Sequence, residues 1–296
     1  MHTKSAFVAI VGRPNVGKSS LLNVFVGEKV AIVSKRPQTT RNRITGIVTK
    51  EETQLVFIDT PGIHRPRTKL SEYMVKEIRD GVADVDVALM LIEPFGEMNP
   101  VEADLLAGLK SKRTPVILVV NKIDLLEKKE IMMPKIQAFS EQCEFEHVYP
   151  ISVLKGDGVQ ALLKILEGYA KEGPHYFDDD AYTDQPERVI VGEIIREKLL
   201  EKLRDELPHG IAVDIEQMKD RPDKDLMDIT AVIYCERESH KGMIIGKKGT
   251  LLKTVASSAR AEMERFLDIK INLQCWVKVQ EDWRNREGMI RRFGFH

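Results

Sequence analysis

Apolar runs alternate with helical patterns through the first half of the chain. The runs are rich in Val, Ile and Leu and are continuous, which is typical of buried strands in a parallel sheet. The predicted strands are Phe7–Val11, Ile44–Thr49, Gln54–Ile58, Val87–Ile92, Pro115–Val120 and His147–Ile151. The predicted helices are Ser20–Val26, Ser71–Gly81, Pro100–Lys110, Pro134–Cys143 and Val159–Ala170. This alternation predicts an α/β domain with a mainly parallel sheet and helices on both faces.

The pattern changes after residues 173–187, a stretch without an apolar period that is expected to be a linker. Beyond it, apolar residues at helical spacing predict a helix over 190–207. The remaining pattern predicts strands over 211–217, 228–234 and 270–279 and helices over 250–266 and 282–292. We therefore expect two domains, 1–172 and 188–296, of which the second is a small α+β domain.

The distribution of charge is more informative than the total. The chain has 296 residues and a formal net charge of −1. Residues 173–236 hold 8 basic and 17 acidic side chains, a net charge of −9, whereas residues 237–296 hold 13 basic and 7 acidic ones, a net charge of +6. A basic C-terminal segment favours a polyanionic partner, and a chance cluster of solvated charges is the alternative.

Cysteine usage and hydropathy indicate a cytoplasmic protein. Cys143, Cys235 and Cys275 are far apart and belong to no C-x-x-C or Cys/His set, so neither structural zinc nor a disulfide framework is expected. No apolar run approaches the roughly 18 residues of a membrane-spanning helix. The first predicted strand also begins close to Met1, without the pattern of a secretory signal.

The segment from Gly12 to Ser19 has the form G-x-x-x-x-G-K-S and joins the first predicted strand to the first predicted helix. In that context the motif is typical of a phosphate-binding loop. Its glycines let successive backbone N–H groups surround an anion, and the helix N-terminus adds partial positive charge. Lys18 is expected to reach the β- and γ-phosphates, and the Ser19 hydroxyl to bind Mg²⁺. The alternative is an ordinary turn between strand and helix.

Two further motifs follow predicted strands. Asp59-Thr60-Pro61-Gly62 has the form D-x-x-G, in which the aspartate can hold Mg²⁺ through water and the glycine N–H can reach a γ-phosphate. Asn121-Lys122-Ile123-Asp124 has the form N-K-x-D. The carboxylate of Asp124 can accept from both N1–H and the 2-amino group of guanine, whereas adenine would leave it buried and unpaired. The motifs therefore predict GTP rather than ATP.

In this order the motifs resemble those of the translation-factor class of P-loop GTPases. The resemblance adds Ser152-Val153-Leu154, in which Val153 offers a backbone N–H to guanine, and a threonine loop. The Thr-Arg pattern there favours Thr40 as the threonine that binds Mg²⁺, and Thr39 remains the alternative. The implied nucleotide-binding residues are Gly12, Arg13, Pro14, Asn15, Val16, Gly17, Lys18, Ser19, Ser20, Asp59, Thr60, Pro61, Gly62, Asn121, Lys122, Asp124, Ser152, Val153 and Leu154. The implied metal ligands are Ser19, Thr40 and Asp59, and the implied catalytic residues are Asn15, Lys18, Thr40 and Gly62.

The group that activates water for hydrolysis is not obvious in the sequence. Many GTPases carry a glutamine directly after the D-x-x-G glycine, whereas this chain has Ile63, which cannot hydrogen-bond to water. Asn15 resembles an asparagine that helps to hold K⁺ against the phosphates in related GTPases, and a purely structural role in the loop is the alternative. We expect weak intrinsic hydrolysis that K⁺ or a bound partner stimulates.

The second domain carries Ile244-Ile245-Gly246-Lys247-Lys248-Gly249. Together with the predicted order of helices and strands, it resembles the G-x-x-G loop of a prokaryotic (type II) KH domain. Glycines allow close approach of a sugar-phosphate backbone, the two lysines can meet phosphates, and Ile244 and Ile245 are expected to form an apolar wall under the bases. The loop therefore predicts binding of single-stranded RNA. A structural joint between two helices is the alternative.

The C-terminal segment contains Trp276, Trp283 and Phe293 among several arginines. It is expected to pack on its own domain or to contact RNA, with a membrane surface as a weaker alternative.

The layout of GTPase domain, linker and KH domain is similar to the bacterial KH-domain GTPases of the Era/TrmE type. That resemblance implies a monomeric GTPase that binds the 3′ region of 16S rRNA and acts in assembly of the 30S ribosomal subunit, with a possible site at the inner membrane surface. Two other classes stay open. One is a binding module in which GTP only licenses RNA binding, and the other is a P-loop ATPase or kinase.

Overall fold

The structure, a computed structural model, describes residues 2–34, 36, 39–61, 68–81, 84–203 and 207–294. The chain divides into two compact units. The first comprises Met1–Ala31, Thr40–Arg65 and Met74–Asp184, and the second comprises Ile32–Thr39, Pro66–Tyr73 and Gln185–His296. Each unit is built around a sheet with its own buried apolar side chains.

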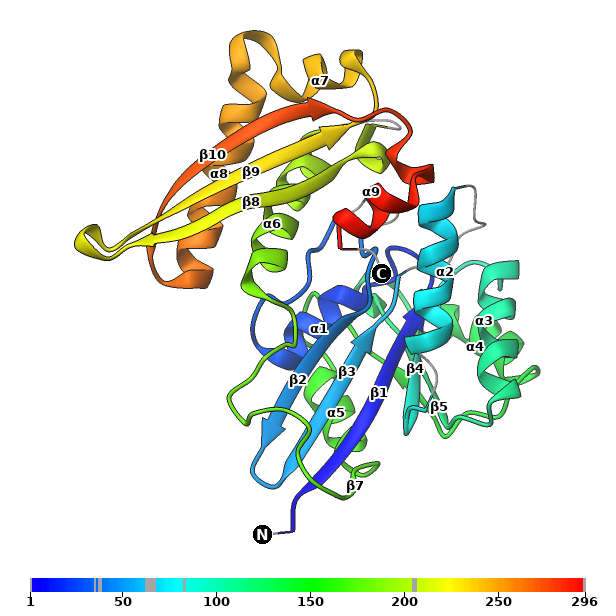
Figure 1. Ribbon diagram of the computed structural model, residues 1–296. Coiled ribbons are helices and arrows are strands. Elements are labelled where there is room, and N and C mark those ends of the chain that lie inside the picture. Colours follow the sequence, from blue (N-terminus) through cyan, green and yellow to red (C-terminus); the bar gives the residue numbers. More distant parts are fainter. Residues whose placement is uncertain are drawn as a thin grey trace. The chain divides into compact units, whose positions relative to one another are not determined.

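The sheet of the first unit has the strand order β2-β3-β1-β4-β5-β6 (Figure 1). Its strands are β1 (Lys4–Gly12), β2 (Ile44–Lys50), β3 (Thr53–Asp59), β4 (Val87–Ile92), β5 (Val116–Val120) and β6 (His147–Pro150). The pairs from β3 to β6 are parallel, and β2 is antiparallel to β3. The central strands are buried on both faces, as their continuous apolar runs predict.

Helices cover both faces of this sheet. Side chains of β1 alternate between two apolar clusters, with Ala6, Val8 and Ile10 in one and Ala9 and Val11 in the other. The first cluster includes α1 (Lys18–Val26) and α5 (Val159–Glu167), and the second includes α3 (Pro100–Ser111) and α4 (Met133–Ser140). The predicted mainly parallel sheet with helices on both faces is therefore confirmed.

Some details differ from the predicted pattern. A short strand, β7 (Lys171–Glu172), pairs antiparallel with β1 just before the predicted linker. Helix α2 (Lys69–Gly81) begins two residues earlier than predicted, and a 3₁₀ turn, Lys129–Met132, precedes the shorter α4. Two residues of antiparallel pairing carry no sequence pattern long enough to identify.

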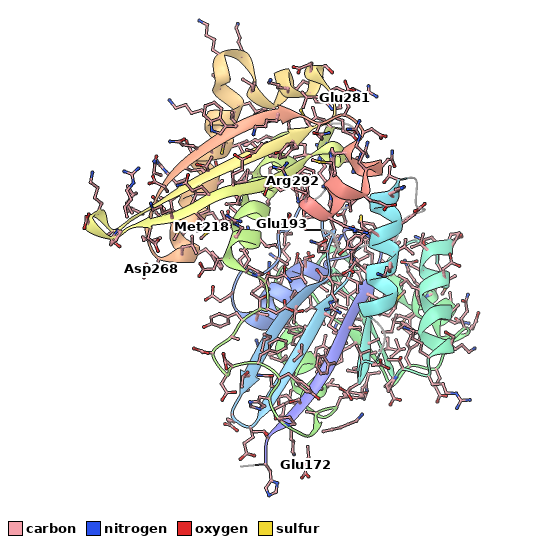
Figure 2. All side chains as sticks on the ribbon, in the orientation of Figure 1. Glu172, Glu193, Met218, Asp268, Glu281 and Arg292 are labelled. Carbon is pink, nitrogen blue, oxygen red and sulfur yellow. The ribbon has the colours of Figure 1, made fainter. Side chains whose placement is uncertain are left out.

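The second unit contains a three-stranded sheet with the order β10-β9-β8. Its elements in chain order are α6 (Glu187–Lys202), β8 (Ala212–Arg221), β9 (Leu226–Cys235), α7 (Glu238–Ile245), α8 (Thr250–Leu267), β10 (Lys270–Val279) and α9 (Glu287–Arg292). Strand β9 is antiparallel to β8 and parallel to β10. In Figure 2, Met218 marks β8, and Asp268 marks the C-terminal end of α8.

The two faces of this smaller sheet are covered differently. Helices α6 and α8 pack on one face through residues such as Ile195, Leu199 and Met263 (Figure 1). The opposite face carries a second cluster with Trp283 and Ile290 from the C-terminal segment. Trp283 is fully buried, and its indole N–H donates to Gly210 O at 2.9 Å. The C-terminal helix is shorter than predicted, since it starts at Glu287 after a 3₁₀ turn.

Candidate nucleotide and RNA sites

The backbone of the glycine loop needs its two glycines. Gly12 has φ 152° and Gly17 has φ 105°, both outside the range that other residues readily adopt. A Cβ on Gly12 would lie 2.5 Å from Leu91 O, and a Cβ on Gly17 would lie 2.3 Å from Asn121 Nδ2. The loop therefore runs so close to β4 and to the N-K-x-D motif that a side chain at either position would force the backbone to move.

Lys18 is held inside this loop. Its Nζ donates to Gly12 O at 3.1 Å and to Arg13 O at 3.0 Å, and the residue is buried. Burial lowers the pKa of Lys18, while the nearby Asp59 carboxylate opposes that shift. The first turn of α1 begins at the same residue, so its unpaired N–H groups and the ammonium group serve one anion-binding position.

Three oxygen-bearing side chains meet beside Lys18. Ser19 Oγ donates to Asp59 Oδ2 at 2.6 Å and lies 2.8 Å from Thr40 Oγ1. Asp59 is fully buried, and its other oxygen, Oδ1, has no hydrogen-bond partner among the described residues. Burial raises the pKa of Asp59 to about 6, against the opposing effects of Lys18 and Ser19. A buried, unpaired carboxylate oxygen next to two hydroxyls is the oxygen-rich donor set that Mg²⁺ prefers.

The structure separates the two candidate threonines. Thr40 is the one whose hydroxyl meets Ser19, whereas the Thr39 hydroxyl donates to Arg36 O at 2.7 Å. Thr60 donates to Ile10 O at 3.0 Å and so ties the D-x-x-G motif to β1. Gly62 and Ile63 lie outside the described residues.

The predicted base-recognition residues lie close together. Asn121 Nδ2 donates to Val16 O at 2.8 Å, which fixes the N-K-x-D motif to the glycine loop. Ser152 Oγ donates to Asp124 Oδ1 at 2.5 Å and orients that carboxylate. The Val153 N–H donates to Asn121 Oδ1 at 3.1 Å, so a contact from this N–H to guanine would have to share or replace that hydrogen bond.

The remaining predicted nucleotide residues line the same region with different exposure. Val16 is buried, and Asn15 is exposed with a left-handed φ of 65°. Leu154 is 80% exposed, so its side chain is open to solvent. Arg13, Pro14 and Ser20 are half-buried, and Pro61 is buried.

The second glycine loop joins α7 to α8. Gly246 has φ 72° and Gly249 has φ 75°, and the lysines between them are both exposed. A Cβ on Gly246 would lie 2.7 Å from the Cβ of Leu251, whereas one on Gly249 would meet no atom within 4 Å. The first glycine thus allows the loop to close on α8, and the two lysines are presented to solvent as a pair of positive charges.

One residue of the predicted RNA surface lies elsewhere. Ile244 is fully buried and belongs to the core of the second unit, so its side chain cannot form an apolar wall under bases. Ile245 is half-buried, so the prediction that it forms an apolar wall under the bases stays a prediction. Since α7 packs on the sheet through its last turn, the first of two consecutive isoleucines turns inward and the second does not.

Comparison with known families agrees with this geometry. Residues 7–122 match the family described as 50S ribosome-binding GTPase, and residues 206–284 match the KH domain family. The GTPase Era of Clostridioides difficile is 52% identical over 293 residues, which cover 99% of both chains. The GTPase Era of Ruminiclostridium cellulolyticum is 49% identical over 295 residues, covering 100% of this chain and 98% of that one. The chain belongs to the Era family of GTPases.

A solved Era structure matches both units. It is the crystal structure of Era in complex with MgGDPNP and nucleotides 1506–1542 of 16S ribosomal RNA, with a TM-score of 0.95, 38% identity and coverage of 99% of each chain. Membership in the Era family establishes that this chain is a GTPase with a P-loop domain and a KH domain. Among the residues that the structure describes, no helix is long and apolar enough to span a membrane.

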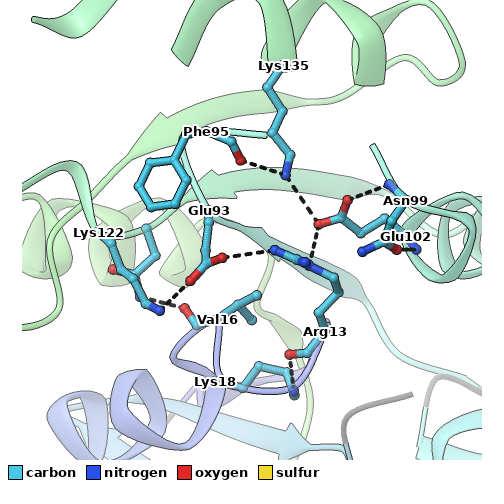
Figure 3. Close-up of polar contacts among 10 residues, drawn as sticks. Arg13, Val16, Lys18, Glu93, Phe95, Asn99, Glu102, Lys122 and Lys135 are labelled. Atoms are coloured by element: carbon cyan, nitrogen blue, oxygen red, sulfur yellow. Dashed lines mark hydrogen bonds and ion pairs between the residues drawn. The ribbon is translucent and has the colours of Figure 1, made fainter. Parts of the chain in front are cut away.

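Sequence reasoning missed two carboxylates beside the glycine loop, Glu93 and Glu102. Glu93 follows β4, and Glu102 lies in the first turn of α3, and both form ion pairs with Arg13 (Figure 3). Glu93 belongs to no motif, so its only sequence signal was a charged residue directly after a buried strand, and the Asn99-x-x-Glu102 spacing is typical of a capping box at a helix start. Glu93 and Arg13 are about 80 residues apart in sequence, so their pairing can be recognised only in the folded structure.

Proposed function

We propose that this member of the Era family is a GTP-controlled switch that binds single-stranded RNA from the 3′ region of 16S rRNA during assembly of the 30S subunit. The observation that carries the proposal is the full-length similarity to an Era protein whose structure holds both MgGDPNP and 16S rRNA nucleotides 1506–1542. The similarity extends over both ligand loops of this chain. We assign the GTPase domain to 1–172, the linker to 173–187 and the KH domain to 188–296.

We assign the triphosphate to the loop from Gly12 to Ser19. The phosphates would accept from the N–H groups of this loop and would replace the Gly12 and Arg13 carbonyl oxygens as acceptors for Lys18. Asp124, oriented by Ser152, is proposed to read the two guanine donors. Asn121 is proposed to hold the base-recognition motif in place, because its side chain hydrogen-bonds both to the phosphate loop and to Val153.

We assign Mg²⁺ to Ser19, Thr40 and Asp59. The Ser19 hydroxyl is within hydrogen-bond distance of both Thr40 and Asp59, and the unpaired Oδ1 of Asp59 is available to a metal-bound water. When bound, Mg²⁺ would neutralise charge on the β- and γ-phosphates. Thr40 is preferred over Thr39, whose hydroxyl is used within its own loop. Because Thr40 would contact both the metal and the γ-phosphate, its position would depend on which nucleotide is bound.

Hydrolysis by this chain is proposed to be slow without a stimulating group. Ile63 replaces the usual glutamine, and Arg13, the arginine of the phosphate loop, is engaged by two carboxylates. A potassium ion held near Asn15 is our candidate for the missing positive charge. Equal single-turnover rates in K⁺ and in Na⁺ would argue against that role.

RNA binding is assigned to Ile245 and the loop Gly246–Gly249. The exposed Lys247 and Lys248 can meet two backbone phosphates, and the two glycines, whose φ values are positive, carry no side chain that would obstruct the RNA strand. Such a contact is mainly electrostatic, so its strength should fall with rising salt concentration.

Contacts within the second unit suggest how nucleotide state would reach the RNA site. Residues Ile32–Thr39, directly before Thr40, group with the KH elements. Arg196 of α6 donates to Thr39 O, and the Val33 N–H donates to Glu197 Oε1 at 2.8 Å. A change in the position of Thr40 on loss of the γ-phosphate would therefore be transmitted to Ile32–Thr39, the segment that is hydrogen-bonded to α6.

Two further predictions belong to this proposal. We expect a monomer, and we expect any membrane contact to be peripheral. Of Trp276, Trp283 and Phe293, Trp283 is buried and Trp276 is 59% exposed. An exposed tryptophan near basic residues suits RNA as well as lipid, and the family match favours RNA.

The proposed function is tested by RNA binding in solution. A labelled single strand from the 3′ end of 16S rRNA should bind the GTP-analogue form of the full chain, and a scrambled strand should bind more weakly. Lys247→Glu with Lys248→Glu should weaken binding of both strands, because the two exposed side chains are assigned to backbone phosphates, which are the same in both. Equal binding of both strands by the native chain, unaffected by the variant, would refute the assignment.

A further inference from the structure

A row of five charged side chains runs along one side of the phosphate loop (Figure 3). Lys122 pairs with Glu93 Oε1, and Arg13 Nη2 donates to Glu93 Oε2 at 2.9 Å. On its other side, Arg13 Nε lies 2.9 Å from Glu102 Oε1, which is also 3.5 Å from Lys135 Nζ. Cations and carboxylates alternate along the row, so every charge in it has at least one opposite neighbour.

The far end of the row is rigidly built. Glu102 is fully buried, and its carboxylate accepts from the Asn99 N–H at 3.1 Å while its own N–H donates to Asn99 Oδ1 at 3.0 Å, which makes a capping box at the start of α3. Lys135 is also buried and donates to Phe95 O at 3.3 Å. Glu102 therefore holds the Arg13 side chain toward α3 and away from the phosphate positions inside the loop.

The near end of the row reaches the base-recognition motif. Lys122 has a left-handed φ of 69°, a conformation that costs free energy for a lysine. Its ammonium group is held by Glu93, whose side chain is 21% exposed. Asn121, the residue before it, is tied to the same loop through Val16 O. The phosphate loop and the guanine motif are thus joined by the hydrogen bond from Asn121 to Val16 O and by the Glu93 carboxylate, which pairs with a cation of each motif.

Removing the negative charge of Glu93 would affect both ends of that bridge. The row has three cations and two carboxylates, so without Glu93 the Lys122 ammonium would lose its carboxylate partner, Arg13 would keep only Glu102, and no negative charge would lie between the two cations. Like charges at such separations repel, and both side chains are only partly exposed, so solvent would not screen the repulsion fully. The two motifs would be expected to move apart.

We propose that Glu93 is a positioning residue for the guanine nucleotide, tying the phosphate-binding loop, through Arg13, to the base-recognition motif, through Lys122. In this role Glu93 would act through Arg13 and Lys122 rather than by contacting the nucleotide itself. Its effect is to keep the two halves of the nucleotide site at one separation, so that a ligand that spans both halves binds without having to order them. The inference rests on the GTP binding of the family and does not involve RNA.

The test uses the full chain with Glu93→Gln, which keeps the size of the side chain and removes its charge. Glu97→Gln, in the same segment after β4, is the matched control because Glu97 is exposed. Dissociation of a fluorescent GDP should be roughly tenfold faster in Glu93→Gln, and Glu93→Asp should be intermediate. The control should match the native chain. The thermal midpoint of the nucleotide-free protein should change little, because the bridge is partly exposed.

A double-mutant comparison separates positioning from a general structural role. If Glu93 acts through Arg13, then Arg13→Gln should speed GDP dissociation, and the combined variant should be no worse than the poorer single variant. Unchanged dissociation in Glu93→Gln would overturn the proposal. So would additive effects in the combined variant, or a fall in nucleotide-free stability large enough to account for the loss of GDP.

Discussion

Both ligand loops of this chain are built on glycines with positive φ, yet their lysines lie in opposite surroundings. Lys18 is buried and hydrogen-bonded to two carbonyl oxygens of its own loop. Lys247 and Lys248 are exposed at the end of α7. A buried, pre-formed loop suits one small ligand of fixed shape, whereas an exposed pair of charges suits a polymer that brings its own regular spacing of phosphates.

The glycines show the same difference. A side chain on Gly17 would collide with Asn121, and a side chain on Gly249 would enter open space. The first loop is confined by the rest of its unit, so changes in it should be costly and specific. The second loop is confined on one side only, so changes in it should act mainly through charge.

The largest expected effect is therefore at Gly17. Gly17→Ala should weaken GTP and GDP binding by on the order of 100-fold, because it combines backbone strain with a 2.3 Å approach to Asn121 Nδ2. Gly249→Ala has a similar positive φ and no collision, so RNA affinity should fall by no more than about fivefold. Calorimetric titration of each ligand checks both values. Similar losses in the two variants would contradict the comparison.

Charge reversal in the exposed loop should have the second-largest effect on ligand affinity. Lys247→Glu with Lys248→Glu should weaken RNA binding by at least roughly tenfold and make it less sensitive to salt, since about two phosphate contacts are lost. GTP hydrolysis without RNA should stay at the native rate. Binding measured over a salt series gives the slope. An unchanged slope would place the RNA elsewhere on the chain.

The buried loop should also show a pH effect that the exposed loop lacks. The pKa of Asp59 is raised to about 6, so its carboxyl is protonated below that pH and ionised above it. A protonated carboxyl is a weaker acceptor for a metal-bound water and carries no negative charge, so Mg²⁺ affinity with bound nucleotide should weaken roughly fourfold from about pH 7.5 to about pH 5.5.

Asp59→Asn provides the control for this pH effect. The nucleotide titrates in both proteins, so only the part of the pH dependence that is missing from Asp59→Asn belongs to the carboxyl. The same pH dependence of Mg²⁺ affinity in both proteins would mean that Asp59 does not titrate in this range.

Much of this arrangement follows from sequence patterns that are local. The apolar runs and glycine motifs predicted the sheet and the nearness of Ser19, Asp59 and Asn121, because parallel strands bring their carboxyl ends to one edge. Strand β7 was missed, since two residues carry no period. Ile244 was assigned to a surface because neighbouring isoleucines look alike until helix packing decides which one turns inward.

The charged row could not be predicted for a different reason. Glu93 and Glu102 join the charged row only through Arg13, Lys122 and Lys135, which lie in separate parts of the sequence. Pairing between distant side chains leaves no periodicity in one sequence. The sequence already favoured Thr40 over Thr39 through its Thr-Arg pattern, and the structure adds that the Thr40 hydroxyl lies beside Ser19 whereas the Thr39 hydroxyl donates to Arg36 O.

The central claim is that nucleotide state in the buried loop controls RNA binding at the exposed one. The most direct measurement is the affinity of the full chain for the 16S rRNA 3′ strand with a GTP analogue, with GDP and without nucleotide. We expect binding to be at least roughly fivefold tighter with the GTP analogue than with GDP, and RNA to tighten binding of the analogue by the same factor. Equal RNA affinity in all three states would contradict the account and leave two independent ligand sites on one chain.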